Sequence, residues 1–201
     1  MAIAPATIAR LKALGFSVCV EAHAGIRSAF TDEQYRAAGA DIGAAMDVWG
    51  QCDVVIKIHP PRQEEIDRAR PGTVLICLLW PAQQGELLKA CAVRQLTVLA
   101  LDCIPRTSKA QSMDVLSSMA NIAGYRAVIE AAAHFGRQFT AQFTAAGKAP
   151  PAKVLVIGAG VAGLAAIGTA RGLGAIVRAF YTRAAAKDEV KSLGAEFLEL
   201  H

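Results

Sequence analysis

The feature that most constrains this chain is a glycine-rich segment placed directly between a strand-like run and a helix-like run. Lys153–Ile157 is short, apolar and β-branched, and Leu164–Arg171 has a helical pattern. Between them, Gly158 permits a tight turn, Gly160 allows a phosphate to approach the backbone, and Gly163 allows close helix–strand packing. The helix N-terminus then offers N–H groups to an anion. This context predicts a dinucleotide phosphate site made by Gly158, Ala159, Gly160, Val161, Ala162 and Gly163. The alternative is a tight turn that packs a helix on a strand and binds nothing.

The chain after the glycine segment continues as half of a dinucleotide-binding fold. Ala175–Tyr181 predicts a return strand, Ala184–Leu193 a helix and Glu196–Leu200 a further strand. In a doubly wound domain this β-α-β-α-β order holds the adenosine end of the dinucleotide, and the nicotinamide end needs a second half. Without that half, one edge of a buried strand is unpaired, which natural proteins avoid.

The end of the second strand departs from the usual pattern. A dinucleotide fold is expected to have an acidic residue there, about 20 residues after the loop, to accept hydrogen bonds from the ribose hydroxyls. Tyr181 occupies the position, and a tyrosine cannot accept from both hydroxyls as a carboxylate does. Arg183 either favours a 2′-phosphate or is simply solvated, so spacing leaves NAD and NADP open. Tyr181, Thr182 and Arg183 complete the predicted nucleotide-binding set.

Strand-like and helix-like runs also alternate through the first half of the chain, which predicts βαβ units. Four runs are continuously apolar, as expected of strands buried on both faces, and we expect them to form one open sheet. These strands are predicted at 17–21, 53–58, 73–79 and 97–102, with helices at 5–14, 31–38, 64–70 and 85–93.

A long helix and a turn-rich segment separate the two strand-rich regions. Apolar residues recur at steps of three and four over 108–138, and Ser108 with Gln111 fits a capping box. Gly147 and the pair Pro150–Pro151 then indicate an irregular or hairpin connection. We therefore predict an α/β fold of two Rossmann-like parallel-sheet subdomains joined by a long helix, the second incomplete. The predicted domains are residues 1–107, a linking helix and connection over 108–152, and the first half of a Rossmann dinucleotide-binding domain over 153–201.

Composition excludes several other classes of protein. The 54% of hydrophobic residues excludes a disordered chain. The five cysteines are scattered without a C-x-x-C, so we interpret them as reduced core residues. The net charge of +4 is spread along the chain without a basic patch, which argues against a nucleic-acid partner. We find no carboxylate or cysteine at ligand spacing from His23, His134 or His201, so no metal is predicted.

Long segments of the chain resemble one family. PRTSKAQSMDVLSSMANIAGYRAVIEAAAHFGR, FTAAGKAPPAKVLVIGAGVAGLAAIGTARGLGAIVRAF and, upstream, APATIARLKALGF, VEAHAG and LLWPAQ look like the NAD(H)-binding domain I of proton-translocating nicotinamide nucleotide transhydrogenase. The resemblance implies two α/β subdomains, a homodimer and NAD(H) as cofactor. It also implies hydride transfer to NADP(H) held on a separate domain, coupled to proton movement through a membrane domain. The chain would then be peripheral, without a transmembrane segment, on the cytoplasmic or mitochondrial-matrix side of the inner membrane.

The resemblance also implies residues on the nicotinamide side of the site. The family's mobile loop carries an arginine, a glutamine and an aspartate, which fall on Arg106, Gln111 and Asp114, with Ser117 as a weaker candidate. Hydride transfer needs two nicotinamide rings held close together in a dry site, and it needs no acid–base group. Without the resemblance, Gln111 completes a capping box and Asp114 favours the first helical turn.

Two other functions stay open. Alanine dehydrogenase shares this architecture, but the positions where its chemistry wants a lysine and a histidine hold His59 and Trp80, which we interpret as a loop residue and a packing residue. A truncated or degenerate module without activity is the second alternative, because Tyr181 replaces the acid. The chain looks truncated at both ends relative to the family, so we expect it not to complete transhydrogenation by itself.

Overall fold

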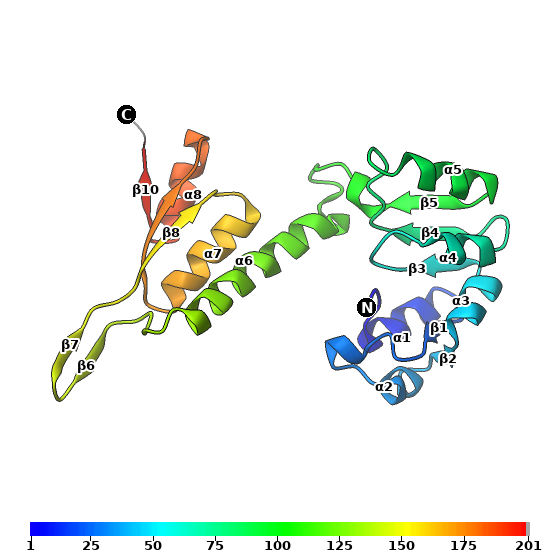
Figure 1. The fold of residues 1–201 in the computed structure, drawn as a ribbon, viewed down its shortest axis with the longest axis horizontal. Helices are drawn as coiled ribbons and strands as arrows, with labels where there is room; N and C mark the ends of the chain where they lie inside the picture. Colours follow the sequence, from blue (N-terminus) through cyan, green and yellow to red (C-terminus); the bar gives the residue numbers. More distant parts are fainter. Residues whose placement is uncertain (200–201) are drawn as a thin grey trace. The chain divides into compact units, whose positions relative to one another are not determined.

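The computed structural model describes residues 1–199, and their contacts divide the chain into two compact units. The units are Met1–Asp114 and Val115–His201, and each is considered by itself (Figure 1). Both are built from parallel strands and helices, which confirms the predicted α/β class. The predicted domain limits at 107 and 152 stay a prediction.

The first unit contains two small parallel sheets. The strands β1 (Cys19–Glu21) and β2 (Asp41–Gly43) pair with each other, and β3 (Val54–Ile56), β4 (Val74–Cys77) and β5 (Thr97–Ala100) form a second sheet in that order. The helices are α1 (Pro5–Ala13), α2 (Asp32–Ala37), α3 (Ala45–Gln51), α4 (Gln63–Arg68) and α5 (Gly85–Val93), with short 3₁₀ turns at Ile26–Ser28, Leu101–Cys103 and Gln111–Met113.

The expectation of one sheet from four strands was wrong. The first predicted strand pairs with β2, which sequence reasoning missed because Asp41, Ile42 and Gly43 contain no β-branched run. Each sheet has its own core. Ile8, Tyr35 and Ala40 are buried beside β1 and β2, and a second cluster, which includes Trp49 and Leu75, packs at the β3-β4-β5 sheet.

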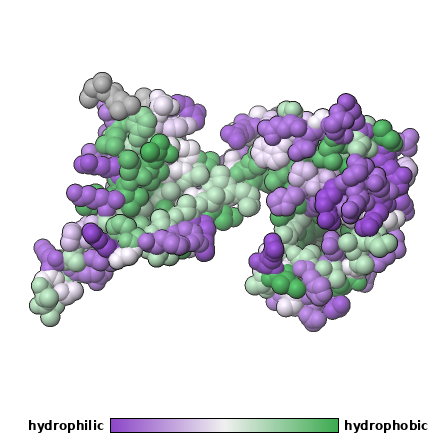
Figure 2. Space-filling view, viewed as in Figure 1, coloured by the Kyte–Doolittle hydropathy of each residue, from purple (hydrophilic) through white to green (hydrophobic). Residues whose placement is uncertain are grey.

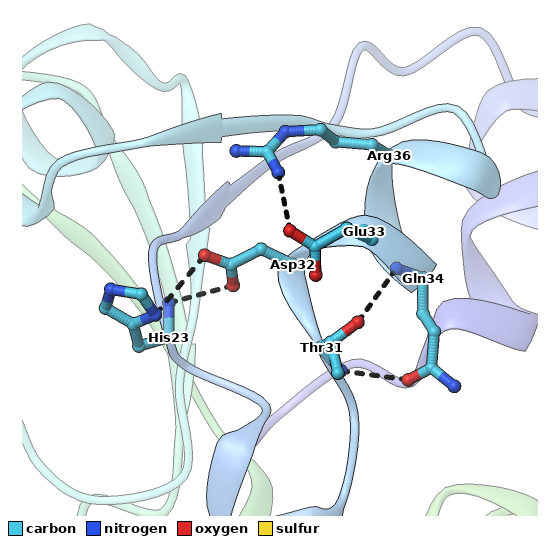
Figure 3. Close-up of polar contacts among 6 residues, drawn as sticks. All are labelled: His23, Thr31, Asp32, Glu33, Gln34 and Arg36. Carbon is cyan, nitrogen blue, oxygen red and sulfur yellow. Dashed lines mark hydrogen bonds and ion pairs between the residues drawn. The ribbon is translucent and has the colours of Figure 1, made fainter.

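The start of α2 is fixed by local hydrogen bonds. The N–H of Gln34 donates to Thr31 Oγ1 at 3.4 Å, and the N–H of Thr31 donates to Gln34 Oε1 at 2.9 Å (Figure 3). Asp32 accepts a hydrogen bond from the backbone N–H of His23 at 2.9 Å, which ties the loop after β1 to this helix. The helix then places the fully buried Tyr35, whose hydroxyl donates to the Ile3 carbonyl at 2.8 Å.

A partly buried ion pair joins the end of β3 to α4. Lys57 Nζ lies 2.6 Å from Glu65 Oε2, and the N–H of Arg62 donates to the same oxygen at 2.6 Å. Burial works to raise the pKa of the Glu65 carboxyl, but the Lys57 ammonium and the Arg62 N–H outweigh it, so that pKa lies below its usual value. Lys57 also lies over the Trp49 ring, 5.4 Å from its centre. Lys57 is therefore part of the framework of this unit.

The second unit begins with the long helix α6 (Val115–His134). The predicted capping box at Ser108 was wrong, because Gln111 belongs to a separate 3₁₀ turn and the helix starts only at Val115. The hairpin interpretation is confirmed: β6 (Gln142–Thr144) and β7 (Gly147–Ala149) pair antiparallel, and Gly147 has φ 124°.

The rest of the second unit is the predicted half of a doubly wound fold. Strands β8 (Lys153–Ile157), β9 (Ile176–Phe180) and β10 (Glu196–Leu198) form a parallel sheet in the order β10-β9-β8, connected by α7 (Val161–Gly172) and then by Ala184–Ala186 and α8 (Lys187–Ser192). Val177 and Ala179 point into a core with Ile167, Ala170 and Val190.

The opposite face of this sheet is exposed. Leu155 and Ile157 alternate with the inward residues of β8, and their side chains are 57% and 78% exposed. Within residues 1–199, β8 pairs on one side only, with β9. Figure 2 shows hydrophobic residues gathered over this part of the second unit. Both faces are covered in complete parallel-sheet domains.

The five cysteines form no disulfide, and two of them are buried. All five cysteines are free thiols, and burial raises the pKa of the Cys77 thiol to about 11, so it is un-ionised at neutral pH. The core interpretation fits Cys77 and Cys91, but Cys103 is exposed.

Among the described helices, none has the length and apolar character that a membrane crossing requires.

Helix α6 approaches α7 so closely that only glycine fits at the contact. A Cβ placed on Gly124 would lie 2.0 Å from the carbonyl oxygen of Ala162. Because the clash is with backbone atoms, it can be relieved only by moving one of the two helices. We therefore expect Gly124→Ala to lower the free energy of unfolding by roughly 1–3 kcal/mol. Urea unfolding followed by circular dichroism measures this loss.

Gly168→Ala is the matched control, because Gly168 lies inside α7 and a Cβ there would have its nearest neighbour, Leu193 Cδ2, at 4.0 Å. We expect this variant to be as stable as the parent or more stable, by roughly 0.5–1 kcal/mol. Equal stability of the two alanine variants would contradict the close contact between α6 and α7.

Candidate nucleotide-binding site

The glycine segment is a tight turn from β8 into α7. Gly158 has φ 110°, a conformation that favours glycine, and its N–H donates to the Phe180 carbonyl at 2.8 Å. That bond ties the loop to the end of β9. A Cβ placed on Gly163 would lie 1.9 Å from the Gly158 carbonyl oxygen. The third glycine is therefore required for the helix to pack against the loop, as the spacing predicted.

The N-terminus of α7 is open to an anion. The helix begins at Val161, so the predicted start at Leu164 was three residues late, because Gly163 continues the first turn without interrupting it. The N-cap residue is Gly160, and no side chain among the described residues caps the helix. A Cβ placed on Gly160 would meet nothing within 4 Å. The first N–H groups of a helix have no intrahelical acceptor, and together with the helix dipole they attract phosphate.

The remaining loop residues lie around this open cradle. Ala159 is buried at 4% exposure in the core of the second unit, and Val161 is 42% exposed at the first helical position. Ala162 lies under Gly124 of α6, with its carbonyl oxygen at the close contact already described. The six predicted residues are thus brought together in one turn, with open space at Gly160.

An aromatic and cationic pair marks the end of β9. Tyr181 directly follows the strand and is half-buried against the core, whereas Thr182 and Arg183 are exposed. Arg183 Nε donates to the Tyr181 hydroxyl at 3.0 Å, and a second guanidinium nitrogen donates to the same oxygen. The guanidinium lies over the Tyr181 ring, 5.0 Å from its centre. Since Gly158 bonds to Phe180, the pair lies beside the loop, at the place where an acid would hold the ribose.

Two acidic side chains of the same sheet region, Glu199 and Glu196, have cationic partners. Lys187, at the start of α8, donates to Glu199, which follows β10, and this contact raises the pKa of the Lys187 ammonium. Arg178 of β9 and Glu196 of β10 also pair, with Nε and Oε2 2.7 Å apart. These carboxylates already have cationic partners.

The residues predicted for the nicotinamide side are divided between the units. Arg106 is exposed in the loop after the 3₁₀ turn Leu101–Cys103, Gln111 is exposed in the next such turn, and Asp114 is half-buried directly before α6. All three belong to the first unit, whereas Ser117 and the glycine loop belong to the second. Their roles stay a prediction.

One polar contact at the end of the β3-β4-β5 sheet was missed by sequence reasoning. Asp102 Oδ1 accepts from the N–H of Leu79 at 2.5 Å, and its Oδ2 accepts from the N–H of Trp80 at 2.9 Å. The available signal was an acidic residue at the end of the predicted strand 97–102. The structure contradicts the interpretation of Trp80 as a packing residue, because it is 43% exposed with φ 55°. His59 lies exposed in the loop after β3, as expected.

A separate open cavity of about 710 Å³ lies among α6, α7 and α8. Its lining includes Ile122 and Tyr125 of α6, Leu164 of α7 and Leu193 after α8. Val161 is the only residue of the predicted phosphate loop that lines it. The cavity is therefore distinct from the cradle at Gly160. A search for clusters of three or more metal-ligating side chains among the described residues finds none.

Comparison with known proteins identifies the family. Residues 1–123 match the model described as alanine dehydrogenase/PNT, N-terminal domain, and residues 127–201 match the corresponding C-terminal domain. NAD(P) transhydrogenase subunit alpha from Haemophilus influenzae is 53% identical over 200 residues, which is 100% of this chain and 39% of that protein.

Two solved structures support the same assignment. The transhydrogenase from Sinorhizobium meliloti matches with a TM-score of 0.94 and 48% identity over 98% of this chain and 59% of that one. An L-alanine dehydrogenase matches with a TM-score of 0.85 and 28% identity, over 100% of this chain and 56% of that one. The chain thus spans about two fifths to three fifths of the length of these proteins. It belongs to the alanine dehydrogenase/PNT family and is similar over its whole length to the alpha subunit of NAD(P) transhydrogenase.

Proposed function

We propose that this chain supplies the NAD(H)-binding part of a nicotinamide nucleotide transhydrogenase, in which hydride passes between NAD(H) and NADP(H). The observation that carries the proposal is the open cradle at Gly160, built where the α7 N-terminus meets the end of β8. A turn with only a packing role would need Gly163, whose Cβ position is blocked, but would not need a glycine at position 160, where the space is free. The similarity to transhydrogenase alpha subunits supports the same choice.

In this proposal each set of residues binds or orients one part of the nucleotide. The N–H groups of Val161, Ala162 and Gly163 bind the pyrophosphate, and Tyr181 with Arg183 lies at the adenosine side. Arg106, Gln111 and Asp114, with Ser117, hold the nicotinamide side and exclude water from it. The bound nucleotide itself supplies the hydride, so these side chains position the ring and transfer no proton.

The partners follow from the same proposal. An NADP(H)-binding domain would receive the hydride, and a membrane domain would couple the transfer to proton translocation, with this chain peripheral on the cytoplasmic or matrix side of the inner membrane. A homodimer is also proposed. The exposed face of the β8-β9-β10 sheet, with Leu155 and Ile157, supports further polypeptide packing on the second unit, because a complete dinucleotide domain covers both faces.

An alanine dehydrogenase-like activity is the competing proposal, supported by the structural match at 28% identity. The side chains at the substrate positions weigh against it, since His59 and Trp80 replace the lysine and histidine, and Lys57 is held by Glu65. Turnover of pyruvate and ammonia with NADH would favour this second activity. An inactive module is the other competitor, and nucleotide binding separates it.

We expect Gly160→Ser to weaken NADH binding at least about tenfold without loss of stability. Serine is a favoured N-cap residue and Gly160 has the extended backbone of an N-cap, so the helix keeps its start. The serine side chain would occupy the space where the phosphate binds, and its hydroxyl oxygen would accept hydrogen bonds from the same backbone N–H groups. Calorimetric titration with NADH measures the affinity, and urea unfolding checks the fold. Unchanged affinity would show that the cradle binds no phosphate.

We expect Tyr181→Asp to tighten NADH binding by roughly 1.5–3 kcal/mol, because a carboxylate accepts charge-assisted hydrogen bonds from the ribose hydroxyls. Tyr181→Phe is the control, since it removes the hydroxyl without adding a carboxylate, and we expect it to give no gain. The same titration measures both variants. If the parent binds only at millimolar NADH and Tyr181→Asp does not improve it, the inactive module becomes the better account.

A further inference from the structure

The Tyr181–Arg183 pair replaces a negative charge by a neutral hydroxyl and a cation. A carboxylate at the end of β9 holds an unmodified ribose and repels a phosphate on its 2′-oxygen, so it selects against NADP(H). In this chain the segment 172–187 contains no acidic residue. The repulsion that enforces NAD(H) is therefore absent at this position.

The pair also offers donors to a 2′-phosphate. The Tyr181 hydroxyl accepts from Arg183 and keeps its own proton to donate. A guanidinium has five N–H donors, and contact with the phenol uses only its Nε and one terminal nitrogen. The guanidinium also lies over the aromatic ring, 5.0 Å from the centre. A planar cation with remaining N–H donors is suited to binding a phosphate.

Two carboxylates of the same sheet region have cationic partners, because Glu199 pairs with Lys187 and Glu196 pairs with Arg178 of β9. The next acidic residue along the chain after Arg183 is Asp188, which follows Lys187. Arg183 is exposed and donates to the neutral Tyr181 hydroxyl, so its positive charge can attract an anion.

We infer that the adenosine end of this site accepts a 2′-phosphate, so that the chain binds NADP(H) about as well as NAD(H). The inference rests on the proposed function, since it names which nucleotides the same cradle takes. Tyr181 and Arg183 are then the specificity-determining residues, through hydrogen bonds and charge at the 2′-oxygen.

Calorimetric titration of the chain with NADH, NADPH and 2′-AMP tests the inference. We expect the Kd for NADPH to be no more than about tenfold above that for NADH, and 2′-AMP to displace NADPH. A preference for NADH greater than about tenfold would overturn the inference and leave the proposed function intact. Failure to bind either dinucleotide would overturn both.

Two variants and a control distinguish a specific role of Tyr181 and Arg183 from a general effect of net charge. Arg183→Gln should weaken NADPH by at least about tenfold and change NADH much less, since only NADPH uses the cation. Tyr181→Asp should weaken NADPH as well. Arg178→Gln changes the net charge as Arg183→Gln does, on an exposed arginine of β9, and should leave the NADPH to NADH ratio unchanged. Equal effects of Arg178→Gln and Arg183→Gln on that ratio would overturn the assignment.

Discussion

The second unit depends on two places where backbone meets backbone without room for a side chain. At one, the carbonyl of Gly158 lies against Gly163, so the first turn of α7 packs directly on the loop that leaves β8. At the other, the carbonyl of Ala162 lies against Gly124 of α6. Together these contacts hold the start of α7 from two sides. The N–H groups of that turn are thereby aimed into the open space at Gly160 by rigid elements, as a preorganised anion site requires.

We propose that the charge around this cradle determines which nucleotide binds there. The loop contributes only backbone donors and a helix dipole, which attract any phosphate. In our proposal, discrimination comes from the side chains at the end of β9, where Arg183 lies over the Tyr181 ring at the position expected for an acid. The match to transhydrogenase alpha subunits identifies the scaffold.

Predictions from the sequence were correct where the local sequence pattern agrees with the tertiary packing. The bounds of β8 and the role of Gly163 were predicted correctly, because an apolar run and a forced glycine are both local signals. The start of α7 was placed too late, since a glycine that breaks a free helix is stabilised here by close packing. The β1–β2 pair was not predicted, because Asp41, Ile42 and Gly43 lack the β-branched run that indicates a strand. The Asp102 contacts to the Leu79 and Trp80 amides were missed as well, because they join two segments that no local pattern connects.

The most direct measurement of the central claim is a ¹H–¹⁵N NMR titration of the labelled chain with NADH. The account predicts that the amide signals of Val161, Ala162 and Gly163 shift in a saturable way, because these N–H groups bind the pyrophosphate. The amides of the β6–β7 hairpin should stay unchanged and serve as the internal reference. NADH binding that leaves the three amides unmoved would contradict the account.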